Sequence, residues 1–124
     1  HKKTTRPVGL SASEAVRVAL IRALIVEPRI LLLDAVVDGL CPLASRRILE
    51  LLFEDIHLRR IGYIISTYHP TIFEGRDMQF MLLYRGEVVF QGKVADIKNA
   101  ENMFLEQYRQ YKTTGPMRAF NEAQ

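Results

Sequence analysis

The residues best suited to chemistry follow two short apolar runs in the sequence. Asp34 follows Ile30–Leu33, and the polar stretch Ser66–His69 follows Tyr63–Ile65. Ligands of open α/β sheets bind beyond the carboxyl ends of the strands, and an acid leaving an apolar strand is a common Mg²⁺ anchor. Asp34 can equally cap the turn into Ala35–Asp38. The pattern indicates a site at this edge, with Asp34 as the candidate metal ligand.

A third candidate site is the start of the helix that we expect after Ser11. Ser11 and Glu14 have the spacing of a capping box, and an apolar run follows them. The free N–H groups at such a helix start can bind an anion. Glu14 can satisfy the same donors itself, and for these residues taken alone we favour that interpretation.

Other kinds of site are not supported by the sequence. The stretch Gly86–Val94 has one residue too many for a phosphate loop and ends in Val, so we reject it. The single Cys41 excludes a disulfide framework and a zinc cluster. His57 is expected on a helix surface, which leaves His69 as the histidine placed for a site. A receiver-like domain with Asp34 as phosphoacceptor lacks its acidic pair and its later lysine.

Length and composition narrow the class of protein further. The chain has 124 residues, a length that allows one domain at most. Its 48% of hydrophobic residues is typical of soluble globular proteins, and its net charge is +3. The charge is too evenly spread to indicate nucleic acid, and the basic start (Lys2, Lys3, Arg6) is expected to be solvated. The most apolar stretch, Val16–Val37, is interrupted by charges and falls short of the roughly 20 apolar residues of a membrane span.

The elements that must position these residues have the order helix, strand, helix, strand, hairpin, helix, an α/β pattern with a parallel core and an antiparallel margin. Charged residues of the first helix share one narrow stripe, so we expect most of that helix to be buried. Two parallel strands cannot cover themselves, so we expect the chain to lack its first half or to take it from a partner. The expected ranges are helices 12–27, 42–58 and 94–111, strands 30–33, 63–66, 78–84 and 87–91, a helical turn at 70–74, and a tail from 113.

In this order the segments resemble the C-terminal half of the ATP-binding cassette (ABC) ATPases, over about residues 8–108. Leu10–Glu14 is similar to the family signature L-S-G-G-Q/E, and Arg17–Leu24 to the helix behind it. Glu27–Asp34 resembles the approach to the Walker B aspartate, and Gly39-Leu40 falls in the D-loop. Leu82–Gly92 resembles the hairpin after the switch histidine. The resemblance implies an incomplete P-loop NTPase-type fold whose phosphate-loop half is absent.

The stretch Ser66–Pro70, followed by Ile72-Phe73, looks most like the G subfamily and its pleiotropic drug-resistance relatives. In that alignment Tyr68 takes the position of the switch histidine, unless His69 slips into its place.

The departures from the family pattern fall on functional positions. Ala35 stands at the position of the Walker B glutamate, and Cys41 at that of the D-loop aspartate. The two signature glycines are Ala12 and Ser13, and the switch histidine is Tyr68. The scaffold residues are kept while the catalytic ones are replaced.

The resemblance therefore implies a degenerate nucleotide-binding domain, over 1–112 with a tail or linker at 113–124, whose status as an enzyme stays open. We expect ATP and Mg²⁺ to bind weakly or only with a partner. Ser11, Ala12, Ser13 and Glu14 would face the nucleotide of a second cassette, and Cys41 would lie beside it. The expected partners are the missing phosphate-loop half, that second cassette and a transmembrane domain, at the cytoplasmic face of a membrane. The alternative is a non-catalytic interaction module.

Overall fold

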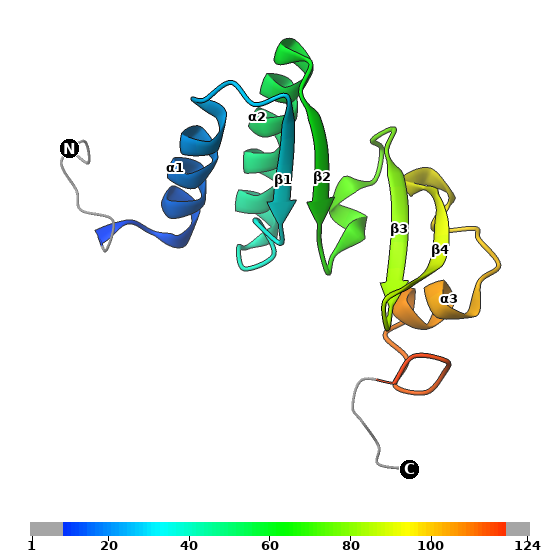
Figure 1. Ribbon diagram of the computed structural model, residues 1–124. Helices are drawn as coiled ribbons and strands as arrows, with labels where there is room; N and C mark the ends of the chain where they lie inside the picture. Colours follow the sequence, from blue (N-terminus) through cyan, green and yellow to red (C-terminus); the bar gives the residue numbers. More distant parts are fainter. Residues whose placement is uncertain (1–8, 119–124) are drawn as a thin grey trace. The chain divides into compact units, whose positions relative to one another are not determined.

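The computed structural model describes residues 9–118, and the chain divides into two compact units, residues 1–72 and 73–124. The two units are built differently, the first around a parallel strand pair and the second around a hairpin (Figure 1). The basic start with Lys2, Lys3 and Arg6 lies outside the described residues, as does the end of the expected tail.

The first unit contains a short parallel sheet, as expected. Strand β1 (Ile30–Asp34) pairs with β2 (Gly62–Ser66) in a register that sets Ile30 opposite Gly62 and Asp34 opposite Ser66. Alternate residues of β1 are buried, because successive side chains of a strand point to opposite faces.

Helix α2 (Pro42–Arg59) covers one face of this sheet (Figure 1). Its apolar residues Ile48, Leu49, Leu52 and Ile56 are all buried, as are Leu31 and Leu33 of β1. Phe53 of α2 packs edge-on against Tyr63 of β2, with ring centroids 5.2 Å apart. This layer is the core of the first unit.

Helix α1 (Ala12–Leu24) is shorter and more exposed than the sequence predicts. It ends at Leu24 rather than Glu27, whose backbone adopts a left-handed conformation with φ of 52° before Pro28. Leu20 is its buried residue, whereas Val18 and Ile21 are more than half exposed. The expectation of a mostly buried helix is wrong for the described residues, since the elements packed against α1 cover little of its apolar surface.

The second unit is an antiparallel hairpin with short helices. Strands β3 (Gln79–Tyr84) and β4 (Glu87–Lys93) are joined by Arg85-Gly86, both with positive φ, which is the conformation of a tight hairpin turn. The predicted hairpin is confirmed, with its second strand extending to Lys93 rather than Gln91. The helical turn expected at 70–74 is present as the 3₁₀ turn η2 (Pro70–Phe73), which precedes the hairpin in the chain.

The single last helix predicted over 94–111 is wrong. A 3₁₀ turn, η3 (Val94–Asp96), and a separate helix, α3 (Met103–Arg109), take its place. The break is stabilised by Asn102, whose side chain accepts a hydrogen bond from the backbone of Leu105 and donates one to the carbonyl of Val89. Asn in this role favours a helix start over a helix interior.

Candidate nucleotide site at the carboxyl edge of the parallel sheet

Asp34 and Ser66 meet at the carboxyl edge of the β1–β2 sheet. The register places them opposite one another, and the Ser66 hydroxyl donates a hydrogen bond of 2.5 Å to Oδ1 of Asp34. The backbone N–H of Ala35 donates to the Ser66 hydroxyl oxygen at 2.9 Å and lies 3.1 Å from the Ser66 carbonyl oxygen. The two strand ends are therefore joined by side chains as well as by the sheet ladder.

Ala35 follows directly in a strained backbone conformation. Its φ is 47°, in the left-handed region that is unfavourable for residues with a Cβ. Its methyl group can neither accept a proton nor hold a water molecule. At this position the strand edge presents backbone and no acid–base group.

A second set of hydrogen bonds joins the loop that follows β1 to the loop that follows β2. Oδ1 of Asp38 accepts a hydrogen bond from the Thr67 hydroxyl, and Oδ2 accepts one from the backbone N–H of Tyr68, both at 2.7 Å. The Thr67 oxygen in turn accepts the backbone N–H of His69 at 3.0 Å. The backbone that carries both candidate switch residues is thus bound to the loop after β1.

Tyr68 and His69 both lie at the surface. Tyr68 is 73% exposed, and His69 is also exposed, so either side chain is accessible to a ligand or a partner. The structure thus brings Tyr68, His69 and Asp34 to one edge of the sheet, as the strand-end pattern predicts.

The capping box at the start of α1 is formed in both directions. The Ser11 backbone N–H donates to Oε2 of Glu14 at 2.9 Å, and the Glu14 N–H donates to the Ser11 hydroxyl oxygen at 3.3 Å. The Ser11 and Ser13 hydroxyl oxygens are 3.4 Å apart. Helix α1 starts at the end of the unit where β1 and β2 finish (Figure 1). Two donors that could face an anion are therefore already engaged by Glu14 and Ser11.

Cys41 is the N-cap residue of α2 and makes no side-chain capping bond. Its thiol is exposed. The first turn of α2 is secured instead by Ser45, whose buried hydroxyl donates to the carbonyl of Val37 at 2.9 Å.

The Asp34 carboxylate is suited to a magnesium ion that takes its other ligands from phosphate and water. Residues 9–118 contain no group of three or more His, Cys, Asp or Glu side chains placed to share a metal. Mg²⁺ in nucleotide sites usually takes one or two carboxylates and completes its shell with water and phosphate oxygens. Asp34, with Oδ2 not used by Ser66, fits that requirement as a single protein ligand.

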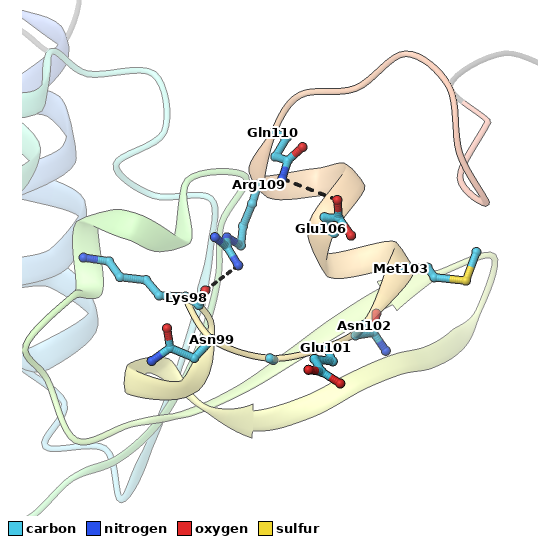
Figure 2. Close-up of a pocket in the computed structure, with 9 residues that line it drawn as sticks. Lys98, Asn99, Glu101, Asn102, Met103, Glu106, Arg109 and Gln110 are labelled. Atoms are coloured by element: carbon cyan, nitrogen blue, oxygen red, sulfur yellow. Dashed lines mark hydrogen bonds between the residues drawn. The ribbon is translucent and has the colours of Figure 1, made fainter.

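A hollow of about 430 Å³ in the second unit is lined by none of the predicted site residues (Figure 2). Its charged side chains are largely engaged already. Arg109 donates to the carbonyls of Ile97 and Lys98, Lys98 pairs with Glu74, and Glu106 pairs with Lys112. We therefore place the candidate site at the sheet edge of the first unit.

Asp38 is a site residue that the sequence did not reveal. The pair Asp38-Gly39 predicts only a turn. In the structure, the Asp38 carboxylate accepts hydrogen bonds from Thr67 and Tyr68, about thirty positions later in the chain. The signal that could have found it is its place just beyond a strand end, next to the end of the neighbouring parallel strand.

Comparisons with known proteins relate the chain to ATP-binding proteins. The chain is 33% identical over 96 residues to the methionine import ATP-binding protein MetN of Photobacterium profundum, covering 77% of the chain and 28% of that protein. It is 31% identical over 106 residues to MetN of Histophilus somni, covering 86% and 31%. The similarity supports an ABC nucleotide-binding domain. No protein-family model matches the chain.

A relative from Arabidopsis thaliana covers more of the chain. The chloroplastic protein TRIGALACTOSYLDIACYLGLYCEROL 3 is 31% identical over 130 residues, covering 90% of the chain and 37% of that protein. The chain thus spans about a third of the length of the curated relatives it matches. The G-subfamily resemblance of Ser66–Phe73 stays a prediction. Within the described residues, no helix has the length and hydrophobicity required to cross a bilayer.

Proposed function

We propose that this chain is part of a degenerate nucleotide-binding domain of an ABC transporter. It supports ATP-dependent transport by pairing with a second cassette and has weak or no hydrolysis of its own. Similarity to two ATP-binding proteins named for methionine import, and the site at the sheet edge, support the proposal.

The observation that carries the proposal is Ala35, next to Asp34 at the strand edge. In the family pattern this position holds the glutamate that polarises the attacking water. Loss of a general base typically slows a reaction by about 10²–10⁴-fold. Ala35 has only a methyl group, and its N–H is directed at Ser66. A nucleotide bound at this edge would therefore meet no general base at residue 35 that could activate water.

The remaining site residues would bind rather than catalyse. Asp34 would hold Mg²⁺, which neutralises phosphate charge when bound. The hydroxyls of Tyr68 and Ser13 can donate hydrogen bonds to phosphate. The side chains of Ala12 and Ser13 narrow the approach of a partner's nucleotide to the start of α1, and Cys41 has no carboxylate to offer at the D-loop position. His69 is the alternative switch residue.

The test is ATP binding and hydrolysis by the purified full-length protein with Mg²⁺. We expect negligible turnover, and we expect Ala35→Glu alone to restore little, because Tyr68 and Cys41 remain. Asp34→Ala is the control that should abolish any metal-dependent signal. Robust, metal-dependent turnover by the unaltered protein that disappears in Asp34→Ala would refute the proposal.

The second candidate is a non-catalytic interaction module. The closed capping box of Ser11 and Glu14 favours it, because this helix start is stabilised without an anion. The same binding assay separates the two candidates. A protein that binds no nucleotide and still pairs with its partner regardless of ATP would be such a module.

A further inference from the structure

The proposed function gives no role to the carboxylate of Asp38, which lies at the same edge of the sheet. Both of its oxygens accept hydrogen bonds of 2.7 Å, one from the Thr67 hydroxyl and one from the backbone N–H of Tyr68. No lysine or arginine forms an ion pair with Asp38 in the described part of the chain. The charge of the carboxylate is therefore directed at the loop that carries Tyr68. Hydrogen bonds to an ionised acceptor are roughly twice as strong as neutral ones.

Asp38 is itself held in place from the other side. Its backbone N–H donates to the carbonyl of Ala35 at 3.2 Å. The preceding residue, Val37, is 3% exposed, and its carbonyl accepts both the Ser45 hydroxyl and the N–H of Leu40. The carboxylate thus projects from a turn that is anchored to the first turn of α2. It can impose a position on Tyr68 rather than follow it.

Only a carboxylate can accept both bonds. An asparagine has one acceptor oxygen, and its NH₂ group could donate to the Thr67 oxygen but could not accept from the Thr67 hydroxyl or the Tyr68 N–H. The substitution would therefore remove the charge and take the acceptor away from one of these two donors. The Thr67 hydroxyl is needed as well, because its oxygen accepts the N–H of His69 while its hydrogen goes to Asp38. We call Asp38, Thr67 and the backbone of Tyr68 the edge latch.

We propose that Asp38 is a positioning residue that fixes Tyr68 and thereby sets the preference of this site for a nucleoside triphosphate over a diphosphate. The inference rests on the proposed function, in which Tyr68 takes the switch position beside the terminal phosphate. A phenol hydroxyl selects a terminal phosphate only when it is held within hydrogen-bond distance of it. A loop that is fixed in advance loses less conformational freedom on binding, and this raises affinity for the ligand that the loop contacts.

The experiment measures the affinities of the full-length protein for Mg²⁺-ATP and Mg²⁺-ADP, together with amide exchange of the peptide that contains Tyr68 and His69. The variants are Asp38→Asn, Thr67→Val and Tyr68→Phe, with Thr67→Ser as the conservative rescue. Asp77→Asn is the matched control, because the Asp77 side chain is 87% exposed and, among residues 9–118, bonds only to Lys93. Thermal melts establish that each variant folds.

We expect Asp38→Asn to weaken ATP binding about tenfold and to leave ADP binding unchanged, as the loss of a charged hydrogen bond predicts. Tyr68→Phe should do the same, and the double variant should lose no more than either single one, because both act through one contact. Thr67→Val should lower the ATP preference, and Thr67→Ser and Asp77→Asn should keep it. Amide exchange at Tyr68 and His69 should accelerate in Asp38→Asn and Thr67→Val.

The outcomes separate this inference from the proposed function. If Tyr68→Phe lowers the preference for ATP and neither Asp38→Asn nor Thr67→Val does, the edge latch is only structural and the inference is wrong. The inference is also wrong if amide exchange accelerates in these two variants while the ratio of their affinities for ATP and ADP stays unchanged. If the unaltered protein binds neither nucleotide, the proposed function fails and the inference fails with it.

Discussion

At the scale of single residues, Ser11 and Glu14 bind each other at the start of α1. Both hydrogen bonds of the capping box are formed, at 2.9 and 3.3 Å. This geometry is local and requires no nucleotide. The family resemblance, in contrast, gives Ser11 a role across a dimer. The two roles predict different effects of the same substitution.

We expect Ser11→Ala to lower the free energy of unfolding by about 0.5–2 kcal/mol, because the N–H of Glu14 loses its acceptor. Glu14→Gln is the matched control, since a glutamine oxygen can still accept the Ser11 N–H. Urea unfolding of the full-length protein measures both. An unchanged unfolding curve for Ser11→Ala, combined with loss of nucleotide-dependent pairing, would show that the serine serves the partner's ATP instead.

The sequence identified site residues whose partners are nearby in the chain or follow from strand pairing. It did not identify a residue whose partners lie on a distant loop. Asp34 and the stretch Ser66–His69 are predictable, because they lie beyond strand ends and the register of a parallel pair brings such ends together. The capping box is predictable because its partners are three residues apart. Asp38 was not identified, since its partners lie on a different loop and a turn explains an Asp-Gly pair equally well.

At the scale of elements, residues 112–118 are tied to α3 by one buried glutamine. The amide of Gln107 donates to the carbonyls of Lys112 and Met117, and its oxygen accepts the N–H of Met117 at 2.7 Å. The N–H of Arg118 donates to the hydroxyl of Tyr84 on β3. The part of the expected tail that the structure describes is therefore hydrogen-bonded to the second unit.

Gly115 permits this arrangement, and we expect Gly115→Ala to disrupt it. A Cβ at residue 115 would lie 2.5 Å from the Gln107 side-chain oxygen, and the φ of 149° is itself unfavourable for alanine. Gln107 is buried and can move away only by giving up its hydrogen bonds to Lys112 and Met117, which costs roughly 1–3 kcal/mol per buried group left unsatisfied. The variant should unfold at lower urea concentration, and trypsin should cleave after Lys112 faster.

Gly39→Ala is the control for that experiment, because nothing lies within 4 Å of the added Cβ and its φ is not positive. Equal stability and equal cleavage in Gly115→Ala and the unaltered protein would contradict the assignment of Gln107 as the residue that holds this segment.

Elements with strong local signals were predicted well, and the last helix was not. Residues 94–111 contain neither glycine nor proline, so an apolar pattern of helical period runs through the break without a stop signal. What divides the region is the side chain of Asn102, which caps α3 and also bonds to Val89 on β4. A tertiary contact of this kind overrides a weak local propensity.

At the scale of the whole molecule, the first unit exposes apolar surface that a stable domain would cover. Ile30, Leu32 and Ile64 are each about two-thirds exposed or more. The alternation of side chains along β1 and its register with β2 place them on the sheet face opposite to the buried Leu31 and Leu33. Parallel strands are normally buried on both faces. The relatives are about three times as long as this chain, so they contain segments that could supply such a cover.

We therefore expect residues 1–124 produced alone to self-associate or to bind a partner, and to bind a hydrophobic dye. Leu32→Gln should reduce self-association, because it removes apolar surface from the centre of the open sheet face. Leu58→Gln is the matched control, since both leucines are 73% exposed and Leu58 lies near the end of α2. Size-exclusion chromatography with light scattering measures the association. A monodisperse monomer with a cooperative melt would contradict the expectation, because it would require two strands and one covering helix to form a stable core without a second layer.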